Sequence, residues 1–244
     1  MADPGPLVDA AMGLAAAGLT VGGWTYAAMY PRSQLFGRVL VAGHNPGELA
    51  LTFDDGPNGD TTLRLLDVLA KHEARATFFV IGRFVRKQPG IVQAIARAGH
   101  IVGNHTMTHP WLHIQTDARI REELRTANVA IEDTLGAPVR FFRPPHGARR
   151  PYVLDYAREL SLTTVQWNII ANDWRPQESS RIVKTIQRGI IRNRRRNHST
   201  NIVLHDGGDV ALGQPRLPTV GAVDTLLASL SSQGIRPVTV DTWL

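Results

Sequence analysis

The chain has 244 residues, of which 43% are hydrophobic, and it carries a formal net charge of +6. This length and apolar content suffice for one domain with a sizeable core, and α/β barrels commonly have this size. The sequence contains no cysteine, which excludes disulfides, thiolate zinc sites and thiol nucleophiles and leaves the redox compartment open.

The N-terminal segment differs in composition from the rest of the chain. No charged residue occurs between Ala10 and Tyr30, a run long enough to span a bilayer as a helix, although its glycines make it weakly apolar. Asp9 precedes the run where an export signal usually carries positive charge, and Arg32 follows it. We expect residues 1–45 to form an apolar segment and linker, either a membrane anchor or a packed helix. The anchor, and with it a cell-envelope location, is slightly favoured over a cytoplasmic one.

Beyond residue 46, strand-like and helix-like segments alternate. The expected strands occupy residues 49–55, 76–82, 100–105, 139–145, 162–169, 201–206 and 235–242. Helical patterns fall between them, over residues 61–72, 91–98, 117–135, 152–160, 179–192 and 220–231. Such alternation predicts parallel strands joined by right-handed crossovers, in a (β/α) barrel or an open doubly wound sheet. Polar residues at the ends of many strands favour the barrel, because an open sheet gathers its site at one switch point.

Basic residues are concentrated in one late segment. They are Arg181, Lys184, Arg188, Arg192, Arg194, Arg195 and Arg196. Such a cluster can meet nucleic acid, anionic lipid or an acidic polymer, or it can be a solvated helix end whose cations complement the helix dipole. Because no base-reading module accompanies the charge, we expect no nucleic-acid partner.

The first expected strand ends in two adjacent acids, within the stretch LALTFDDGPNG. Asp54 and Asp55 lie at its carboxyl end, and turn residues follow them. Because successive side chains of a strand point to opposite faces, the two carboxylates can take separate roles, and a bound cation would relieve their repulsion. Capping of the following turn by one acid is the alternative.

The third expected strand ends in GNHTMTHP, where His105 and His109 stand four residues apart. On a helical turn this spacing brings two imidazoles to one face. With one of the acids they provide two histidines and a carboxylate, a set that leaves open positions on zinc or a similar divalent ion. A non-haem iron oxygenase uses the same set, and an ordinary surface pair of histidines is a further alternative.

Three further strand ends supply groups that a metal-dependent hydrolase needs. In FFRPPHG, Arg143 offers a fixed charge that can hold a neighbouring carboxylate. In NDWRP, Asp173 stands beside Trp174, and in IVLHDGG, His205 is a candidate general acid. Each has an ordinary structural alternative, as a surface pair, a cap or a core histidine. Their recurrence at successive strand ends indicates a site at the C-terminal face of a barrel.

The ordered motifs TFDDGP, HTMTHP, RPPHG, NDW and LHD resemble the five motifs of the polysaccharide deacetylases, the NodB-homology family of metal-dependent carbohydrate esterases. The resemblance runs from about Leu49 to Trp243. It implies a deformed (β/α) barrel with about seven parallel strands, preceded by the N-terminal apolar helix, and makes residues 46–244 the catalytic domain. The implied reaction removes N-acetyl groups from N-acetylglucosamine-containing poly- or oligosaccharides, of the chitooligosaccharide or peptidoglycan type. Removal of O-acetyl groups from xylan-type glycans is the alternative.

The resemblance also implies a role for each motif residue. Asp54 is the expected general base with Arg143 as its partner, and His205 is the expected general acid with Asp173 as its partner. The expected ligands of a divalent metal, most readily zinc but also cobalt, nickel or manganese, are Asp55, His105 and His109. The residues expected to contact the glycan are Pro145, His146, Trp174, Val203, Leu204 and Trp111.

Two residues depart from the pattern that this family often has. His146 stands where Tyr is frequent, and Val203 stands where Leu is frequent. Both are expected at the pocket for the acetyl methyl group, so they bear on the substrate more than on the reaction. Trp111 and Trp174 are candidate sugar-stacking platforms, with a buried core position as the alternative for each.

Overall fold

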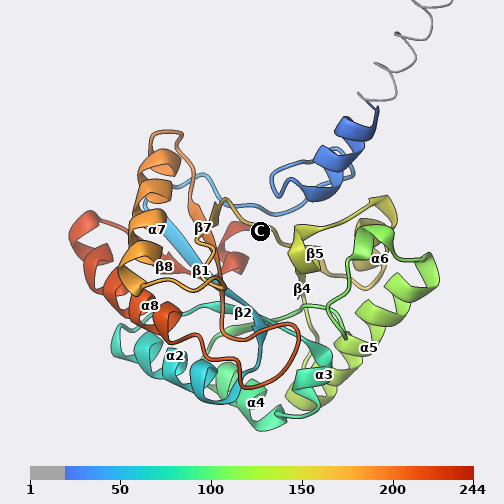
Figure 1. Cartoon of the computed structure of the whole chain (residues 1–244), viewed down its shortest axis with the longest axis horizontal. Helices are drawn as coiled ribbons and strands as arrows, with labels where there is room; N and C mark the ends of the chain where they lie inside the picture. The colour runs from blue at the N-terminus through green and yellow to red at the C-terminus, as the bar shows by residue number, and fades with distance from the viewer. Residues whose placement is uncertain (1–19) are drawn as a thin grey trace, which may run out of the picture.

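A computed structural model describes residues 20–244 of the chain and has one curled sheet at its centre (Figure 1). The strands are β1 (Glu48–Gly56), β2 (Thr77–Val80), β3 (Ile101–Asn104), β4 (Phe141–Phe142), β5 (Thr163–Thr164), β6 (Ile169–Ile170), β7 (Thr200–His205) and β8 (Arg236–Val238). Seven of them follow the order β5-β4-β3-β2-β1-β7-β6, and β8 pairs with β1. All recorded pairings are parallel. The expected deformed barrel is confirmed, and its one additional strand arises because the expected strand over residues 162–169 is divided into β5 and β6.

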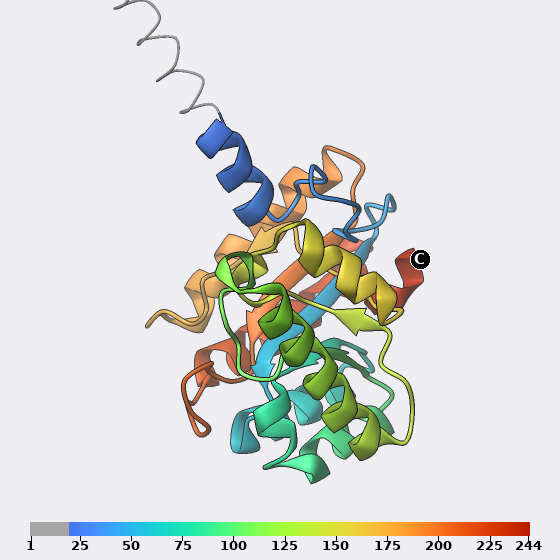
Figure 2. The ribbon, with the colours of Figure 1, turned by 90° about the vertical axis from the view of Figure 1, so that its right-hand side faces the viewer.

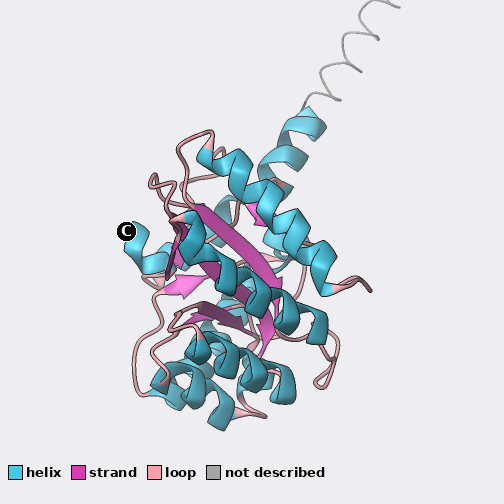
Figure 3. Ribbon diagram, turned by 90° about the vertical axis from the view of Figure 1, so that its left-hand side faces the viewer, coloured by secondary structure: helices cyan, strands magenta, loops and turns pink. Residues whose placement is uncertain are grey.

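Helices cover the outer face of the sheet (Figures 1 and 3). They are α2 (Gly59–Lys71), α3 (Gly82–Val85), α4 (Pro89–Arg97), α5 (Asp117–Leu135), α6 (Pro151–Glu159), α7 (Ser179–Arg194) and α8 (Leu217–Leu230). Short 3-10 turns occur at η1 (Leu112–Ile114), η2 (Pro145–Gly147), η3 (Ser231–Gln233) and η4 (Val240–Trp243). The sequence predicted a single helix over residues 91–98 and missed α3, which is too short to show a helical period.

The core lies between the sheet and its helices. Along β1, Leu51 and Phe53 belong to the large apolar cluster that the helices cover. Period-two alternation turns Thr52 and Asp54 to the opposite, inner side of the sheet. Each fully buried Leu or Phe side chain contributes about 1.5–3 kcal/mol relative to exposure. The apolar face therefore fixes which way Asp54 points.

The sheet remains open between its edge strands β5 and β6, which the sequence predicted as one strand over residues 162–169. The chain between them pairs with the N-terminal segment instead. Leu40 N–H donates to Thr164 O at 2.8 Å, and Gln166 N–H donates to Leu40 O at 2.8 Å. The expected strands over residues 139–145 and 235–242 are also shorter, as β4 and β8. Proline accounts for part of this at β4, because Pro144 has no N–H to donate.

A helix over residues 20–29 extends from the body of the domain (Figure 2). Its final turn is attached to the domain, since Ala27 and Ala28 are buried and Arg149 N–H donates to Ala28 O at 3.0 Å. Of the candidate anchor over residues 10–30, residues 10–19 lie outside the described part of the chain. None of the helices within residues 20–244 combines the length and the apolar character that a bilayer crossing requires.

Candidate active site

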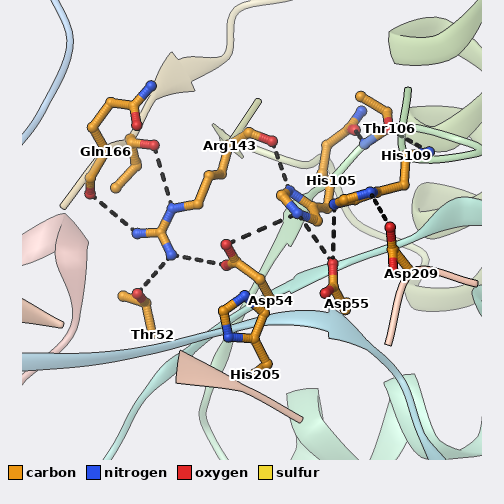
Figure 4. A network of polar contacts seen from close by, with 12 residues as sticks. Thr52, Asp54, Asp55, His105, Thr106, His109, Arg143, Gln166, His205 and Asp209 are labelled. Carbon is orange, nitrogen blue, oxygen red and sulfur yellow. Dashed lines mark hydrogen bonds and ion pairs between the residues drawn. The ribbon is translucent and has the colours of Figure 1, made fainter. Parts of the chain in front are cut away.

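The carboxyl end of β1 delivers two carboxylates to one cavity. The pairing of β1 with β2 shifts register between Asp54 and Gly56, and Asp55 adopts a positive φ of 71°. This irregularity explains why both acids line the same cavity instead of opposite faces of the sheet. Gly56 is required at this turn, because a Cβ there would lie 2.3 Å from the Asp206 carboxylate. The two carboxylates nevertheless meet different partners (Figure 4).

Asp54 pairs with a buried arginine. Nη1 of Arg143 donates to Asp54 Oδ1 at 2.8 Å and to Thr52 Oγ1 at 2.6 Å. Nη2 donates to Gln166 O at 3.1 Å, and the guanidinium lies 4.2 Å from the centre of the Phe79 ring. Burial lowers the pKa of Arg143, and the Asp54 carboxylate acts against that shift. This web of contacts fixes the Asp54 carboxylate in one orientation.

Asp55 faces two imidazoles. Its Oδ1 lies 3.5 Å from His105 Nε2 and 3.1 Å from His109 Nε2, yet this buried oxygen has no hydrogen-bond partner within residues 20–244. Burial raises the pKa of Asp55, but the two imidazoles outweigh it and hold the pKa well below its usual range. Since buried polar atoms are normally satisfied, the three ligand atoms fit a divalent cation between them.

The orientation of His105 supports the same fit. Its Nδ1 lies 2.8 Å from the carbonyl oxygen of Arg143, so Nδ1–H donates there and the lone pair of Nε2 faces Asp55. His109 is placed between two carboxylates, with Nδ1 lying 3.4 Å from Asp209 Oδ2. Burial lowers the pKa of His109, but Asp209 and Asp55 raise it to about 9. A cation bound at this group would take the place of that proton.

His205, at the end of β7, is held by Asp173. Nδ1 of His205 donates to Asp173 Oδ1 at 2.8 Å, and the backbone N–H of His205 donates to Asp173 Oδ2 at 2.8 Å. Thr219 Oγ1 donates to the same Oδ2 at 2.8 Å. Burial lowers the pKa of His205, but the Asp173 charge and hydrogen bond, with help from Asp55 and Asp54, raise it to about 9. The imidazole therefore carries a proton at neutral pH.

These groups open into a cavity of about 410 Å³. Trp111 and Trp174 line it and are 42% and 37% exposed, so neither is a core tryptophan. Trp111 stacks on His146 with ring centres 3.7 Å apart, and Trp174 meets His205 edge to face at 5.0 Å. Burial lowers the pKa of His146 to about 4, with a smaller effect from the charges of His109 and His105. The cavity thus has two aromatic walls and a floor of titratable groups.

The structure brings most of the predicted site residues to this cavity. Those that line it are Asp54, Asp55, His105, His109, Trp111, His146, Trp174, Val203 and His205. Arg143 and Asp173 are buried and contact the lining residues Asp54 and His205. Pro145 is buried in η2 and is not among the lining residues. Leu204 was predicted to contact the glycan, but it belongs to the core cluster, because side chains alternate along β7 and Val203 takes the cavity side.

Sequence reasoning missed four lining residues. Asp209 and Arg216 come from the loop after β7, and Trp167 and Ile170 come from the open side of the sheet. Arg216 Nε donates to Gly207 O at 2.9 Å, which ties that loop to the cavity rim. Asp209 forms a second candidate metal-binding group with His109 and His146. In the sequence, only the position of Asp209 four residues after His205 indicated that it could reach the site, and that spacing does not predict the path of the loop.

Together, the parallel α/β sheet and the acid and imidazole pairs at its carboxyl edge are those of a hydrolase. A family model described as polysaccharide deacetylase matches residues 42–165. The peptidoglycan-N-acetylglucosamine deacetylase PgdA of Listeria monocytogenes is 33% identical over 193 residues, which cover 79% of this chain and 38% of that protein. The chitooligosaccharide deacetylase of Azorhizobium caulinodans is 32% identical and covers 82% of this chain and 96% of its own length.

A solved structure agrees with these relatives. The crystal structure of the peptidoglycan N-acetylglucosamine deacetylase Bc1960, in complex with 4-naphthalen-1-yl-N-oxidanyl-benzamide, superimposes with a TM-score of 0.75 and 30% identity. The match covers 84% of this chain and 92% of that one. This chain belongs to the polysaccharide deacetylase family. The resemblance drawn from the five motifs is confirmed, and the iron oxygenase alternative has no support.

Proposed function

We propose that this protein is a metal-dependent deacetylase that removes N-acetyl groups from N-acetylglucosamine-containing poly- or oligosaccharides. The observation that carries the proposal is the position of the Arg143-bound carboxylate of Asp54 beside the group formed by Asp55, His105 and His109. The names of the two relatives support a glycan of the peptidoglycan or chitooligosaccharide type.

Asp55, His105 and His109 would hold the metal. Two imidazoles and one carboxylate suit zinc first, and they also accept cobalt, nickel or manganese. A divalent ion bound there supplies Lewis-acid polarisation of the acetamide carbonyl and makes water more acidic. The chain itself fixes the tautomer of His105 that a metal ligand requires. The carbonyl oxygen of Arg143 accepts the Nδ1–H hydrogen bond, which leaves the lone pair of Nε2 free to bind the metal.

Asp54 is the proposed general base. Attack on an amide carbon requires removal of a proton from the incoming water, and a carboxylate within hydrogen-bond reach can accept it. Arg143 keeps Oδ1 engaged at 2.8 Å, so Oδ2 is the oxygen left to receive the proton. The buried guanidinium also stabilises the negative charge of the resting base.

His205 is the proposed general acid. The amine leaves only when its nitrogen gains a proton, because an amine anion is too basic to depart. His205 donates that proton from Nε2, since its Nδ1–H is directed to Asp173. The peptide N–H that follows Pro145, on His146, is the proposed donor to the developing oxyanion.

The aromatic walls are the proposed glycan contacts. Trp174 and the Trp111–His146 stack face the cavity, where sugar rings can pack on them. Val203 is placed to contact the acetyl methyl group, because it is the apolar side chain of β7 on the cavity side. The cell-envelope location expected from the sequence stays a prediction, which fractionation of the expressed chain tests.

The test is acetate release from a panel of acetylated glycans, with and without a chelator. Chitooligosaccharides, peptidoglycan glycan strands and acetylated xylan separate the candidate substrates. We expect chelator-sensitive acetate release from the first or second and little from xylan. Acetate release from xylan alone would indicate that the protein hydrolyses O-acetyl esters and not N-acetyl amides. No release from any glycan after metal loading would contradict the proposal.

A further inference from the structure

A second cavity, of about 570 Å³, adjoins the catalytic one. Trp167 and Ile170 line both cavities. The other walls come from α7, from the segment that follows the helix over residues 20–29, and from Asn168 and Ile169. The two cavities are therefore neighbours that share two side chains, Trp167 and Ile170.

The second cavity is basic. Its charged lining consists of Arg32, Arg188, Arg192 and Arg196, without any Asp or Glu among the lining residues. The ion pairs recorded within residues 20–244 involve other arginines. Arg192 donates to a backbone oxygen, that of Asn168, at 3.3 Å. Among the described residues no acidic side chain pairs with these four arginines, and an anionic ligand would relieve their mutual repulsion.

The helical pattern of α7 explains how the arginines face the cavity. Ile182, Ile186 and Ile190 recur every four residues and are buried against the core. Arg188 and Arg192 recur with the same spacing on the exposed side, so their guanidinium groups lie one turn apart. Arg32 reaches the cavity from the N-terminal segment. Two parts of the chain that are distant in sequence thus supply cations to one cavity. This convergence is not expected if the arginines merely form the solvated end of a helix.

We propose that this cavity binds a carboxylate of an acidic glycan while an N-acetyl group of the same glycan occupies the catalytic cavity. This inference rests on the deacetylase function proposed above and narrows its substrate to a glycan in which a carboxylate-bearing sugar neighbours the acetylated one. Arginine suits the role because its planar fork binds carboxylates through two hydrogen bonds. Tyr30 and Trp167 supply aromatic surface for the sugar that carries the acid.

An anionic lipid surface is the other partner that arginines can meet. Two observations favour the glycan. The arginines line a concave cavity, whereas a bilayer presents a broad surface, and the cavity lies next to the catalytic one, with which it shares Trp167 and Ile170. The lipid remains an outcome of the test.

The experiment measures dissociation constants for the full chain in the presence of a chelator, so that turnover does not consume the ligand. Three probes are used: a tetramer of alternating N-acetylglucosamine and N-acetylmuramic acid, the same tetramer with its carboxylates converted to amides, and chitotetraose. We expect the acidic tetramer to bind about tenfold more tightly than its amide, which corresponds to about 1.4 kcal/mol. The preference should decrease as salt is added.

Two matched double variants locate the preference. Arg32→Gln with Arg188→Gln removes two cavity charges and should abolish the preference without changing affinity for chitotetraose. Arg181→Gln with Lys184→Gln removes the same charge from exposed positions of α7 outside the cavity and should retain the preference. Phosphatidylglycerol vesicles form the lipid arm, with phosphatidylcholine vesicles as the neutral reference.

Equal affinity of the wild type for the acidic tetramer and its amide would overturn the proposal, as would a preference that survives in the cavity variant. Equal affinity together with vesicle binding that only the cavity variant loses would assign the arginines to lipid. Acetate release, assayed separately with the metal-loaded protein, tests the deacetylase function independently of the carboxylate subsite. A preference without acetate release contradicts the deacetylase, and acetate release without a preference contradicts only the carboxylate subsite.

Discussion

The guanidinium of Arg143 and the carboxylate of Asp54 are joined by a 2.8 Å hydrogen bond in the interior, where Arg143 is fully shielded from water. A buried pair of this kind repays its desolvation only when the remaining donors are satisfied. Thr52, Val165 and Gln166 accept hydrogen bonds from the same guanidinium. Arg143 therefore stabilises the domain and positions Asp54 at once.

Removal of this arginine should damage both stability and turnover. Arg143→Ala leaves a buried carboxylate without its counterion, so we expect the free energy of unfolding to fall by about 3–5 kcal/mol. Chemical denaturation measures this loss. Arg140→Ala, which removes an exposed arginine, should change stability by less than about 0.5 kcal/mol. An Arg143→Ala protein with wild-type stability and activity would show that the pair has neither role.

Asp173 should set the alkaline limit of activity. The pKa of His205 is raised to about 9, and Asp173 is the largest contributor to that rise. An acid with a raised pKa works below that pKa and is lost as pH rises through it, so Asp173→Asn should move the alkaline limb of the pH–rate profile to lower pH. Thr219→Ala removes a hydrogen bond to Asp173 but keeps its charge, and should shift the limb much less. If the alkaline limb of the pH–rate profile is the same in Asp173→Asn and the wild type, His205 is not the general acid.

His100 should make the stability of the protein sensitive to acid, because its pKa differs between the folded and the unfolded chain. Its Nδ1 accepts a hydrogen bond from Ala76 N–H at 3.2 Å, so it is neutral in the fold, and burial, with a smaller effect from Arg75, lowers its pKa to about 4. The unfolded chain takes up a proton near pH 6.5, so this contribution is complete above pH 6.5 and is lost as pH falls from there to about 4. The loss amounts to at most about 3 kcal/mol.

The variant His100→Gln tests that assignment. Its free energy of unfolding should fall less than that of the wild type between pH 7 and pH 4, because glutamine does not titrate. The other acidic and basic groups change equally in both proteins, so the difference between the two curves isolates His100. Parallel curves would assign the acid sensitivity to other groups.

Much of the site could be predicted because its residues follow apolar strands. Asp54, His105 and His205 each come directly after a buried run, and parallel strands bring such ends to one edge. Arg143 and Asp173 could be named as partners because their motifs, RPPHG and NDW, resemble those of the polysaccharide deacetylases in sequence and order. These statements depend on local pattern, which the sequence contains.

The remaining features depend on tertiary packing. The positive φ of Asp55 turns its carboxylate into the same cavity as that of Asp54, contrary to the alternation of side chains along a strand. No pattern in the sequence predicts this backbone conformation. Leu204 and Val203 have equal apolar character, so only the observed face of β7 distinguishes them. Asp209 and Arg216 reach the cavity through a loop whose path is set by contacts such as the bond from Arg216 to Gly207 O. The second cavity requires residues far apart in the chain to converge.

The adjacent acids carry the central claim, that Asp54 is the base and Asp55 a metal ligand. Metal content measured alongside turnover in Asp54→Asn and Asp55→Asn tests it most directly. An amide cannot accept the water proton but leaves the ligands intact, so Asp54→Asn should keep its metal and lose about 100-fold or more in turnover, even at saturating metal. Asp55→Asn should lose metal, and excess metal should restore part of its activity. A metal-free Asp54→Asn beside a metal-replete Asp55→Asn would reverse the two roles, and full activity in both would place the reaction elsewhere.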